Sequence, residues 1–363
     1  MKLVMTLVAR DEIDIVDAQL AFHLNAGVDF VIATDHGSSD GTTDVFRRYE
    51  REGVLRLLRE EGDYHEAEWR TRMARLAATE HGADWVFASD ADEFWWPRGG
   101  SLKDVLQAIP SRYGVVRAFW RPFVPRPDDG SFFAERMTAR LSPTAPINDP
   151  LSQWRPNAKV LHRGRADATV GRGNHTVDGT DLIPLRGWYP VEVLHFPLRT
   201  REQFERKASV WHSTQTVRFH EAHRAASEAV ASGRGEEAFG ALVVDDAQLE
   251  RGLADGSLVL DVRLRDALRT LAGVEILEPV GDPGVSRFSL PREGGSPLRF
   301  PLPTVVEDAA YAVDVATLGE ADVVRAQRRL DVLEERIAEL ERRPTARLER
   351  LVRRAVGRVR RSA

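Results

Sequence analysis

The sequence predicts an α/β fold in which helices flank a mostly parallel central sheet. In the first third of the chain, short apolar runs typical of buried strands alternate with segments whose apolar residues recur at helical spacing. Three of these runs end in clusters of polar residues, at the position where ligands bind beyond the carboxyl ends of parallel strands. The 363 residues, 42% hydrophobic and 29% charged, suffice for one large or two ordinary globular domains.

The first elements follow from these patterns. Ile13, Val16 and Leu20 recur at helical spacing, and Gly27 can end the helix that contains them. Tryptophan, valine and phenylalanine in the run after Asp84 suit the pleated surface of a buried strand. We therefore expect strands at residues 2–8, 30–34, 54–58 and 84–89, and helices at residues 13–25, 45–49 and 69–80.

The middle of the chain is less regular. We expect residues 95–100 to form a loop, and Ser101 to cap a short helix over residues 102–109. Residues 121–156 are rich in proline and aspartate and have no clear period, which indicates a binding loop with Trp154 and Arg155 as contacts. Further strands are expected at residues 114–120, 157–161 and 191–196.

Composition excludes several classes of function. The chain has no cysteine, which excludes disulfides and thiolate chemistry, and its net charge of −5 gives no overall attraction to nucleic acid. The first residues contain a single lysine and a short apolar run before Asp11 and Glu12, so we expect neither a signal peptide nor a membrane span. These features favour a cytoplasmic protein. Only four lysines stand against 47 arginines.

An acidic cluster follows the strand expected at residues 84–89. Asp90, Asp92 and Glu93 lie within four residues, and carboxylates this close repel one another unless a cation lies among them. Carboxylate and phosphate oxygens are the ligands that Mg²⁺ and Mn²⁺ prefer. The cluster therefore suggests a divalent metal that holds a phosphorylated substrate. The alternative is an ordinary solvated acidic loop.

Four motifs resemble those of known enzymes. Residues 34–42, Thr-Asp-His-Gly-Ser-Ser-Asp-Gly-Thr, resemble the nucleotide-binding turn of family 2 glycosyltransferases. Asp90-Ala91-Asp92 is similar to the DxD motif of the GT-A fold, and the extended Asp-Ala-Asp-Glu-Phe form resembles a subgroup of family 2-like bacterial transferases. Residues 10–12, Arg-Asp-Glu, resemble that subgroup's Arg-Asn-Glu turn with aspartate in place of asparagine. Residues 195–207 are similar to the end of its catalytic domain.

The resemblance covers roughly residues 1–215 and implies a GT-A fold that binds a nucleotide-diphosphate sugar. It places Asp35 at the nucleobase or ribose, Arg10 near phosphate and Glu12 near the base. Asp40 belongs to the same turn, although an aspartate there can equally cap a helix. Lys207, one of the four lysines, is expected to neutralise the diphosphate; helical surface charge is the alternative.

The same resemblance implies how a metal is held. Asp92 is the expected ligand, because the last carboxylate of the motif usually meets the ion. Asp90 then faces the sugar or ribose, or binds the metal through water, and His195 completes the site as a late histidine. Glu93 positions the acceptor or metal-bound water, or else caps the following loop. Mn²⁺ or Mg²⁺ would bridge the two phosphates and neutralise charge on the departing nucleoside diphosphate.

The catalytic base is less clear. An inverting transfer needs a carboxylate or imidazole to take the proton of the acceptor hydroxyl. Family 2 enzymes typically supply it from an acidic pair about a hundred residues beyond the DxD motif, and this chain has no such pair there. The remaining candidates are Asp149, His175, Asp178 and Glu192.

The second half divides into three further regions after a catalytic domain at residues 1–215. Residues 216–318 form an accessory region, of which the part up to residue 240 is helical in pattern. Residues 319–343 contain a short heptad seam, typical of a coiled coil or of a helix packed on the body. Residues 344–363 form a basic amphipathic tail, which suits either an anionic membrane surface or a solvated terminus.

Together these features predict a metal-dependent glycosyltransferase, inverting by resemblance, that moves a hexosyl or related sugar from a nucleotide-diphosphate donor to a glycan or lipid-linked acceptor. We expect a peripheral position at the inner face of the plasma membrane if the tail binds lipid, and a homo-oligomer if the heptads pair. Two alternatives stay open. One is a non-catalytic nucleotide-binding protein for assembly or membrane recruitment, and the other is a phosphohydrolase that uses the acidic cluster.

Overall fold

The computed structural model describes residues 1–142, 157–213, 221–291 and 297–342. Its centre in these residues is an eight-stranded sheet with the order β3-β2-β1-β4-β8-β6-β11-β5. The strands are β1 (Leu3–Ala9), β2 (Phe30–Asp35), β3 (Leu55–Arg59), β4 (Trp85–Asp90), β5 (Glu93–Pro97), β6 (Val115–Pro122), β8 (Ala158–Arg163) and β11 (Val191–His195). Adjacent strands among β1 to β4 are parallel, and β6 is parallel to β11. Strand β8 is antiparallel to both of its neighbours, β4 and β6, and β5 is antiparallel to β11.

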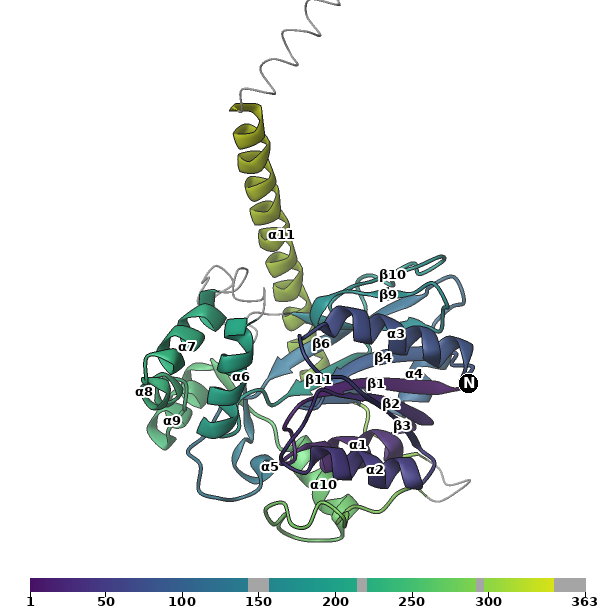
Figure 1. The fold of residues 1–363 in the computed structure, drawn as a ribbon, viewed down its shortest axis with the longest axis vertical. Coiled ribbons are helices and arrows are strands. Elements are labelled where there is room, and N and C mark those ends of the chain that lie inside the picture. The colour runs from purple at the N-terminus through teal and green to yellow at the C-terminus, as the bar shows by residue number, and fades with distance from the viewer. Residues whose placement is uncertain (143–156, 214–220, 292–296, 343–363) are drawn as a thin grey trace, which may run out of the picture.

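Helices cover both faces of this sheet (Figure 1). Helices α1 and α2 lie on one face, and α3 lies on the other. The helices are α1 (Val16–Asn25), α2 (Thr42–Arg51), α3 (Glu66–Thr79), α4 (Leu102–Gln107), α5 (Phe133–Arg136), α6 (Arg201–Ser213), α7 (Glu221–Ala231), α8 (Gly235–Gly240), α9 (Asp246–Asp255), α10 (Arg263–Ala272) and α11 (Val305–Arg342). The predicted fold class, a mostly parallel sheet flanked by helices with a helical C-terminal extension, is confirmed.

Strand β1 shows why this sheet is two-sided. Leu3, Met5 and Leu7 belong to the core beneath α1 and α2, whereas Val4 and Val8 belong to the core beneath α3. Successive side chains of a strand point to opposite faces, so a strand covered on both sides is apolar along most of its length; in β1 the buried Thr6 is the exception. Burial on both faces accounts for the largely apolar run at the start of the sequence.

The segment after the acidic cluster differs from the expected loop. Residues 93–97 form β5, an edge strand that pairs antiparallel with β11. Trp95 and Trp96 are both buried in the main core, so neither is placed to stack on a ligand. The predicted cap of α4 is confirmed, because the Ser101 hydroxyl accepts from the backbone amide of Asp104 in a capping box.

The irregular middle region contains small elements that the sequence pattern did not indicate. Helix α5 and strand β7 (Ala139–Leu141) lie within it, and β7 pairs with β12 (Leu258–Leu260). A second small pair joins β9 (Thr169–Val170) to β10 (Val177–Asp178). Asp149, Trp154 and Arg155 lie outside the described residues, so their predicted roles stay predictions.

Helices α6 to α9 gather to one side of the sheet, and α11 projects from the body (Figure 1). Helix α11 begins at Val305, earlier than the heptad pattern indicated, and its first turns pack against Phe119 and Tyr189. The basic tail predicted over residues 344–363 lies outside the described residues. Within the described chain, we find no helix whose length and apolar content would let it cross a bilayer.

A buried histidine ties the edge strand β5 to α1. Nδ1 of His23 lies 2.8 Å from the carbonyl oxygen of Gln19, and Nε2 accepts the backbone N–H of Trp95 at 3.0 Å. Because a carbonyl oxygen can only accept, Nδ1 carries the proton and the ring is neutral. Burial lowers the pKa of His23 to about 3, against the Gln19 hydrogen bond that opposes this shift.

Because His23 is buried in its neutral form, the free energy of unfolding should depend on pH. Protonation favours the unfolded chain, in which the histidine pKa is near 6.5, so the contribution of neutral His23 is complete above pH 6.5 and is lost as the pH falls toward 3. In denaturant unfolding, the stability advantage of the wild type over His23→Gln should shrink by about 2 kcal/mol between pH 7.5 and pH 5. An advantage that is equal at both pH values would contradict this assignment.

Candidate active site

The three polar turns predicted from the sequence meet at one edge of the sheet. β1 lies between β2 and β4, and all three run parallel. The register places Ala9 beside Asp35 and Val8 beside Asp90, so the turns after the three strands begin at the same level. This confirms that the carboxyl ends of these strands converge.

The turn after β2 is held by its own carboxylates. Asp35 is fully buried; its Oδ1 accepts the Ser38 amide at 3.1 Å and its Oδ2 accepts the Thr43 hydroxyl at 2.5 Å. Asp40 accepts the amide and hydroxyl of Thr42 at 3.0 and 2.6 Å and the Ile13 amide at 3.0 Å. Asp40 therefore stabilises this turn and links it to the turn after β1, whereas the residue at the N-cap of α2 is Gly41.

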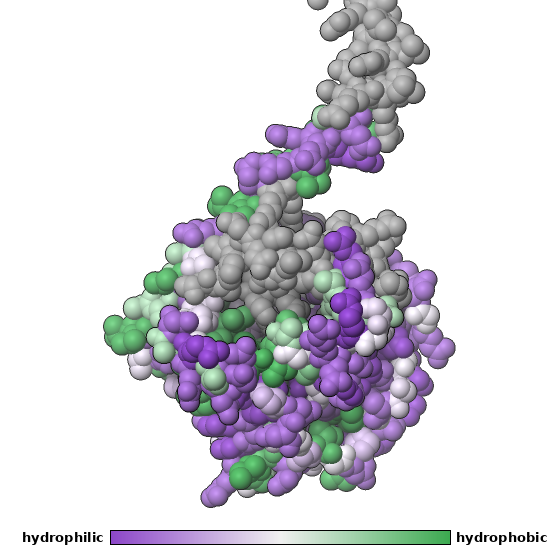
Figure 2. Space-filling model, turned by 90° about the vertical axis from the view of Figure 1, so that its left-hand side faces the viewer, coloured by the Kyte–Doolittle hydropathy of each residue, from purple (hydrophilic) through white to green (hydrophobic). Residues whose placement is uncertain are grey.

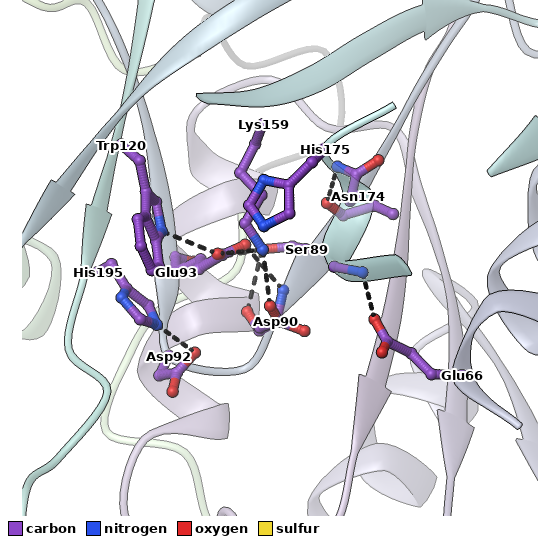
Figure 3. Close-up of polar contacts among 12 residues, drawn as sticks. Glu66, Ser89, Asp90, Asp92, Glu93, Trp120, Lys159, Asn174, His175 and His195 are labelled. Atoms are coloured by element: carbon purple, nitrogen blue, oxygen red, sulfur yellow. Dashed lines mark hydrogen bonds and ion pairs between the residues drawn. The ribbon is translucent and has the colours of Figure 1, made fainter. Parts of the chain in front are cut away.

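On one side of the acidic cluster, Asp90 is neutralised by two buried cations. Its carboxylate pairs with the Arg70 guanidinium from α3 and accepts from Lys159 Nζ on β8 at 2.9 Å. Lys159 Nζ also lies 2.7 Å from Glu93 Oε1, which accepts the Trp120 indole N–H at 3.2 Å. Figure 3 shows Asp90, Glu93 and Trp120 converging on Lys159.

On the other side, Asp92 is neutralised by residues that follow β11. Lys207 Nζ lies 2.5 Å from Asp92 Oδ2 and 3.3 Å from Glu12 Oε1. The Arg199 guanidinium, fully buried, pairs with Glu12 and lies 2.5 Å from Asp14. His195 Nε2 lies 3.5 Å from Asp92 Oδ1. The cluster thus brings together four residues that were predicted as site residues from different segments of the sequence: Glu12, Asp92, His195 and Lys207.

These pairings set the protonation states. Burial by itself raises the pKa of Asp92, but Lys207, His195 and Arg199 outweigh it and hold that pKa well below its ordinary value. At Asp90, Lys159 and Arg70 likewise outweigh burial, and its pKa is lowered. Burial raises the pKa of Glu93 to about 7, against the attraction of Lys159. At neutral pH the two aspartates are therefore ionised, whereas Glu93 titrates.

Two other predicted residues lie in different surroundings. Arg10 is exposed, and its Nε lies 3.8 Å from Asp11 Oδ2 in a surface ion pair. Glu192 is buried on β11, with Arg121 Nε 2.6 Å from Oε1 and Arg263 Nη1 2.8 Å from Oε2. Although burial raises the pKa of Glu192, these arginines lower it overall. Both oxygens of Glu192 are engaged by cations, so we withdraw it as a base candidate.

Both ring nitrogens of His175 lie beside polar atoms of the neighbouring strand segment. Its Nδ1 lies 2.8 Å from the Ala158 carbonyl oxygen, so this nitrogen is the donor and Nε2 carries the lone pair. Nε2 lies 3.4 Å from the amide nitrogen of Asn157, and the ring centroid is 6.2 Å from that of Trp120 (Figure 3). The preceding Asn174 is fully buried and donates to carbonyl oxygens of β4 and β8, which fixes the segment that carries His175.

Sequence reasoning missed Arg70, Lys159 and Trp120. Arg70 was hidden in a predicted helix that carries several other arginines, and Trp120 ends a predicted strand. Lys159 is one of only four lysines and stands in a predicted buried strand. A charged side chain in such a strand is rare unless it is paired, and that signal could have found it.

The residues at this edge of the sheet supply some of the ligand atoms that a divalent cation requires. Asp92 and His195 supply two suitable ligand atoms, and His195 Nδ1 has no hydrogen-bond partner among the described residues. In the same residues no three histidine, cysteine, aspartate or glutamate side chains are grouped as a complete metal site. Magnesium sites commonly use one or two protein ligands and take the rest from phosphates and water. The residues therefore fit a cation shared with a diphosphate.

No protein-family model matches the chain, and none of the curated proteins is similar to it in sequence. Among solved structures, residues 1–349 of S. aureus TarS are 13% identical, with 59% of this chain and 66% of that chain covered and a TM-score of 0.32. The same segment in complex with UDP gives 14% identity, 74% and 90% coverage and a TM-score of 0.31.

A third similar structure is mannose-1-phosphate geranyltransferase from Thermus thermophilus, at 11% identity, 68% and 69% coverage and a TM-score of 0.25. The chain thus spans just under two thirds of the TarS segment in the first of these matches. Identities and TM-scores this low carry no argument about activity, which must come from the geometry of the site.

Removing the charge of Lys159 should lower the stability of the protein considerably. In Lys159→Met, Asp90 and Glu93 would be buried beside each other without their shared cation, and the free energy of unfolding should fall by about 3–5 kcal/mol. In Lys103→Met, which removes a partly exposed pair with Asp29, the loss should be about 1 kcal/mol or less. Denaturant unfolding of both variants checks this difference, and equal losses would contradict it.

Proposed function

We propose that this chain is a metal-dependent glycosyltransferase of the GT-A type, which takes a sugar from a nucleotide-diphosphate donor and inverts its anomeric carbon. One observation carries the proposal: the turns after three adjacent parallel strands converge, and there Glu12 and Asp92, from two of these turns, meet His195 at the end of β11 and Lys207 on α6. The motif resemblance in these same turns supports the choice of a nucleotide sugar as the ligand.

The proposed roles follow from the charges. Lys207 is partly exposed, so it can turn from Asp92 and Glu12 toward the diphosphate when the donor enters. Asp92 and His195 would then hold Mn²⁺ or Mg²⁺, which neutralises the leaving nucleoside diphosphate. Asp90, fixed by Arg70 and Lys159, would accept hydrogen bonds from donor hydroxyls. Asp35 would hold the turn that receives the nucleoside.

We propose His175 as the base that takes the proton of the acceptor hydroxyl. Its lone pair is on Nε2, because Nδ1 donates to the Ala158 carbonyl, and Asn174 fixes the segment. Glu93 is fully buried and bonded to Lys159, Trp120 and the Asp90 amide, so it has the environment of a positioning residue. The acceptor, a glycan or a lipid-linked sugar, and the predicted location at the inner membrane face belong to this proposal.

Binding of nucleoside diphosphates tests the metal assignment. If Asp92 holds the cation, Mn²⁺ should strengthen the binding of at least one of UDP, GDP, ADP and CDP to the wild type by tenfold or more. In Asp92→Ala this enhancement should disappear. Asp44→Ala, which removes an exposed carboxylate on α2, should keep it. Isothermal titration with and without Mn²⁺ measures the effect, and an enhancement that survives in Asp92→Ala would refute the assignment.

Turnover of nucleotide sugars tests both the role of His175 as the base and the class of reaction. With a panel of UDP-, GDP-, ADP- and CDP-sugars and Mn²⁺, the wild type should release the nucleoside diphosphate from one donor. His175→Gln should lower kcat by about 10²- to 10⁴-fold and leave nucleotide affinity unchanged. His65→Gln, at an exposed position before α3, is the matched control.

The other outcomes separate the alternatives. If no donor is turned over although nucleotide binds, the chain is a nucleotide-binding protein for assembly or recruitment. Release of inorganic phosphate in place of a nucleoside diphosphate would favour a phosphohydrolase. That reaction would need a nucleophile at Asp90, whose two oxygens are already engaged by Arg70 and Lys159.

A further inference from the structure

Helix α11 consists of a docked part and a projecting part. In the docked part, the Tyr311 hydroxyl donates to the Tyr189 carbonyl, Asp314 lies 2.5 Å from Arg121, and Leu318 is fully buried. The ion pair of Asp322 with Arg117, at 2.8 Å, lies at the end of this part. From there the helix leaves the body and continues to Arg342 (Figure 1).

The projecting part carries an apolar seam that nothing in the described chain covers. Figure 2 shows hydrophobic side chains among hydrophilic ones along this part of the helix. Exposed fractions of the large apolar residues on the seam are 69% for Val323, 53% for Leu330, 57% for Leu333, 56% for Ile337 and 43% for Leu340. With Ala326 these residues recur at alternating steps of three and four, which is the a and d pattern of a heptad repeat.

A lone helix of this kind is not expected to hold its shape. An isolated helix of about 20 residues is marginal in water, and most helical stability in proteins comes from packing an apolar face. The projecting part has such a face and keeps helical geometry through Arg342. Its seam therefore requires a partner helix.

The residues on the seam indicate which partner. Of the three a positions, Val323 and Ile337 are β-branched and the third is Leu330; of the three d positions, Leu333 and Leu340 are leucine and the third is Ala326. β-Branched residues at a with leucine at d favour two parallel strands, and four of the six positions follow this rule. In a parallel pair a g position faces the e position five residues further along the other copy, so Glu334 at e faces position 329 and Arg336 at g faces position 341. The sequence has arginine at 329 and glutamate at 341, which gives opposite charges in both contacts. A second copy of the same helix satisfies both conditions without any other protein.

We propose that residues 323–342 of α11 form a parallel, two-stranded coiled coil with the same residues of a second copy of this chain. The contact is isologous: each copy offers the same seam to the other. It holds two bodies together at the ends of their docked helices and leaves the edge of the sheet that carries Asp92 uninvolved. This inference does not depend on the proposed reaction.

Light scattering or sedimentation equilibrium of the full chain tests the proposal. The wild type should have twice the chain mass of 40.7 kDa at tens of micromolar. Leu333→Lys places a charge on the seam and should give the mass of one chain. Val332→Lys is the matched control: Val332 is the preceding residue, is 64% exposed and lies off the seam at a c position, so this variant should remain a dimer.

Each other outcome overturns part or all of the proposal. A wild type that stays monomeric excludes the coiled coil, and a trimer or tetramer excludes the two-stranded form. Equal effects of Leu333→Lys and Val332→Lys exclude the seam as the contact. Both positions lie outside the folded body, so both variants should keep its thermal transition; a lost transition in Leu333→Lys alone would show that the seam packs on the body instead.

Cysteine cross-linking tests the parallel orientation, because the chain has no cysteine of its own. In a parallel pair the two copies of Val323→Cys face each other, and oxidised glutathione should join them through a disulfide as each cysteine loses one hydrogen. In an antiparallel pair residue 323 would face the region of residue 340, ~26 Å along the helix. Cross-linking only in mixtures of Val323→Cys with Leu340→Cys would therefore overturn the parallel arrangement.

Discussion

The candidate site depends on charge balance at one short turn. Asp90 and Asp92 are two residues apart at the end of a buried strand, where desolvation raises the pKa of each carboxyl and the neighbouring cations lower it. Arg70 and Lys159 neutralise Asp90 from the side of α3 and β8, whereas Lys207 and Arg199 neutralise Asp92 from the segment after β11. The turn therefore joins elements that lie far apart in the sequence.

The two sides of the turn differ in a way that suits a binding site. On the Asp90 side, the cations Arg70 and Lys159 are buried and tied into a network with Glu93 and Trp120, whereas the Asp90 side chain itself is 33% exposed. On the Asp92 side, Asp92 and His195 are buried and only the cation Lys207 is partly exposed. The cations of Asp90 are therefore fixed by burial, whereas the Lys207 cation of Asp92 reaches the surface.

Much of the fold could be predicted because the spacing of apolar residues along the chain indicates which side chains are buried. The runs of β1, β2 and β4 are mostly apolar, as is typical of strands covered on both faces, and their polar ends mark the edge of the sheet where the turns meet. The prediction failed at β5, where Trp95 and Trp96 precede a proline and a glycine pair that resemble a loop. Pro97 is tolerated because it ends an edge strand, and only the pairing with β11 reveals this.

By itself the sequence determined the alternation of strands and helices, the three strand-end turns and the acidic cluster, because these features are local in the chain. Only the tertiary structure decided which cation meets which carboxylate, since Lys159 and Lys207 reach Asp90 and Asp92 from 69 and 115 residues away. The same holds for Glu192, which looked like a free acid until Arg121 and Arg263 were found against it. Charge pairing between distant segments leaves no periodic trace in a single sequence.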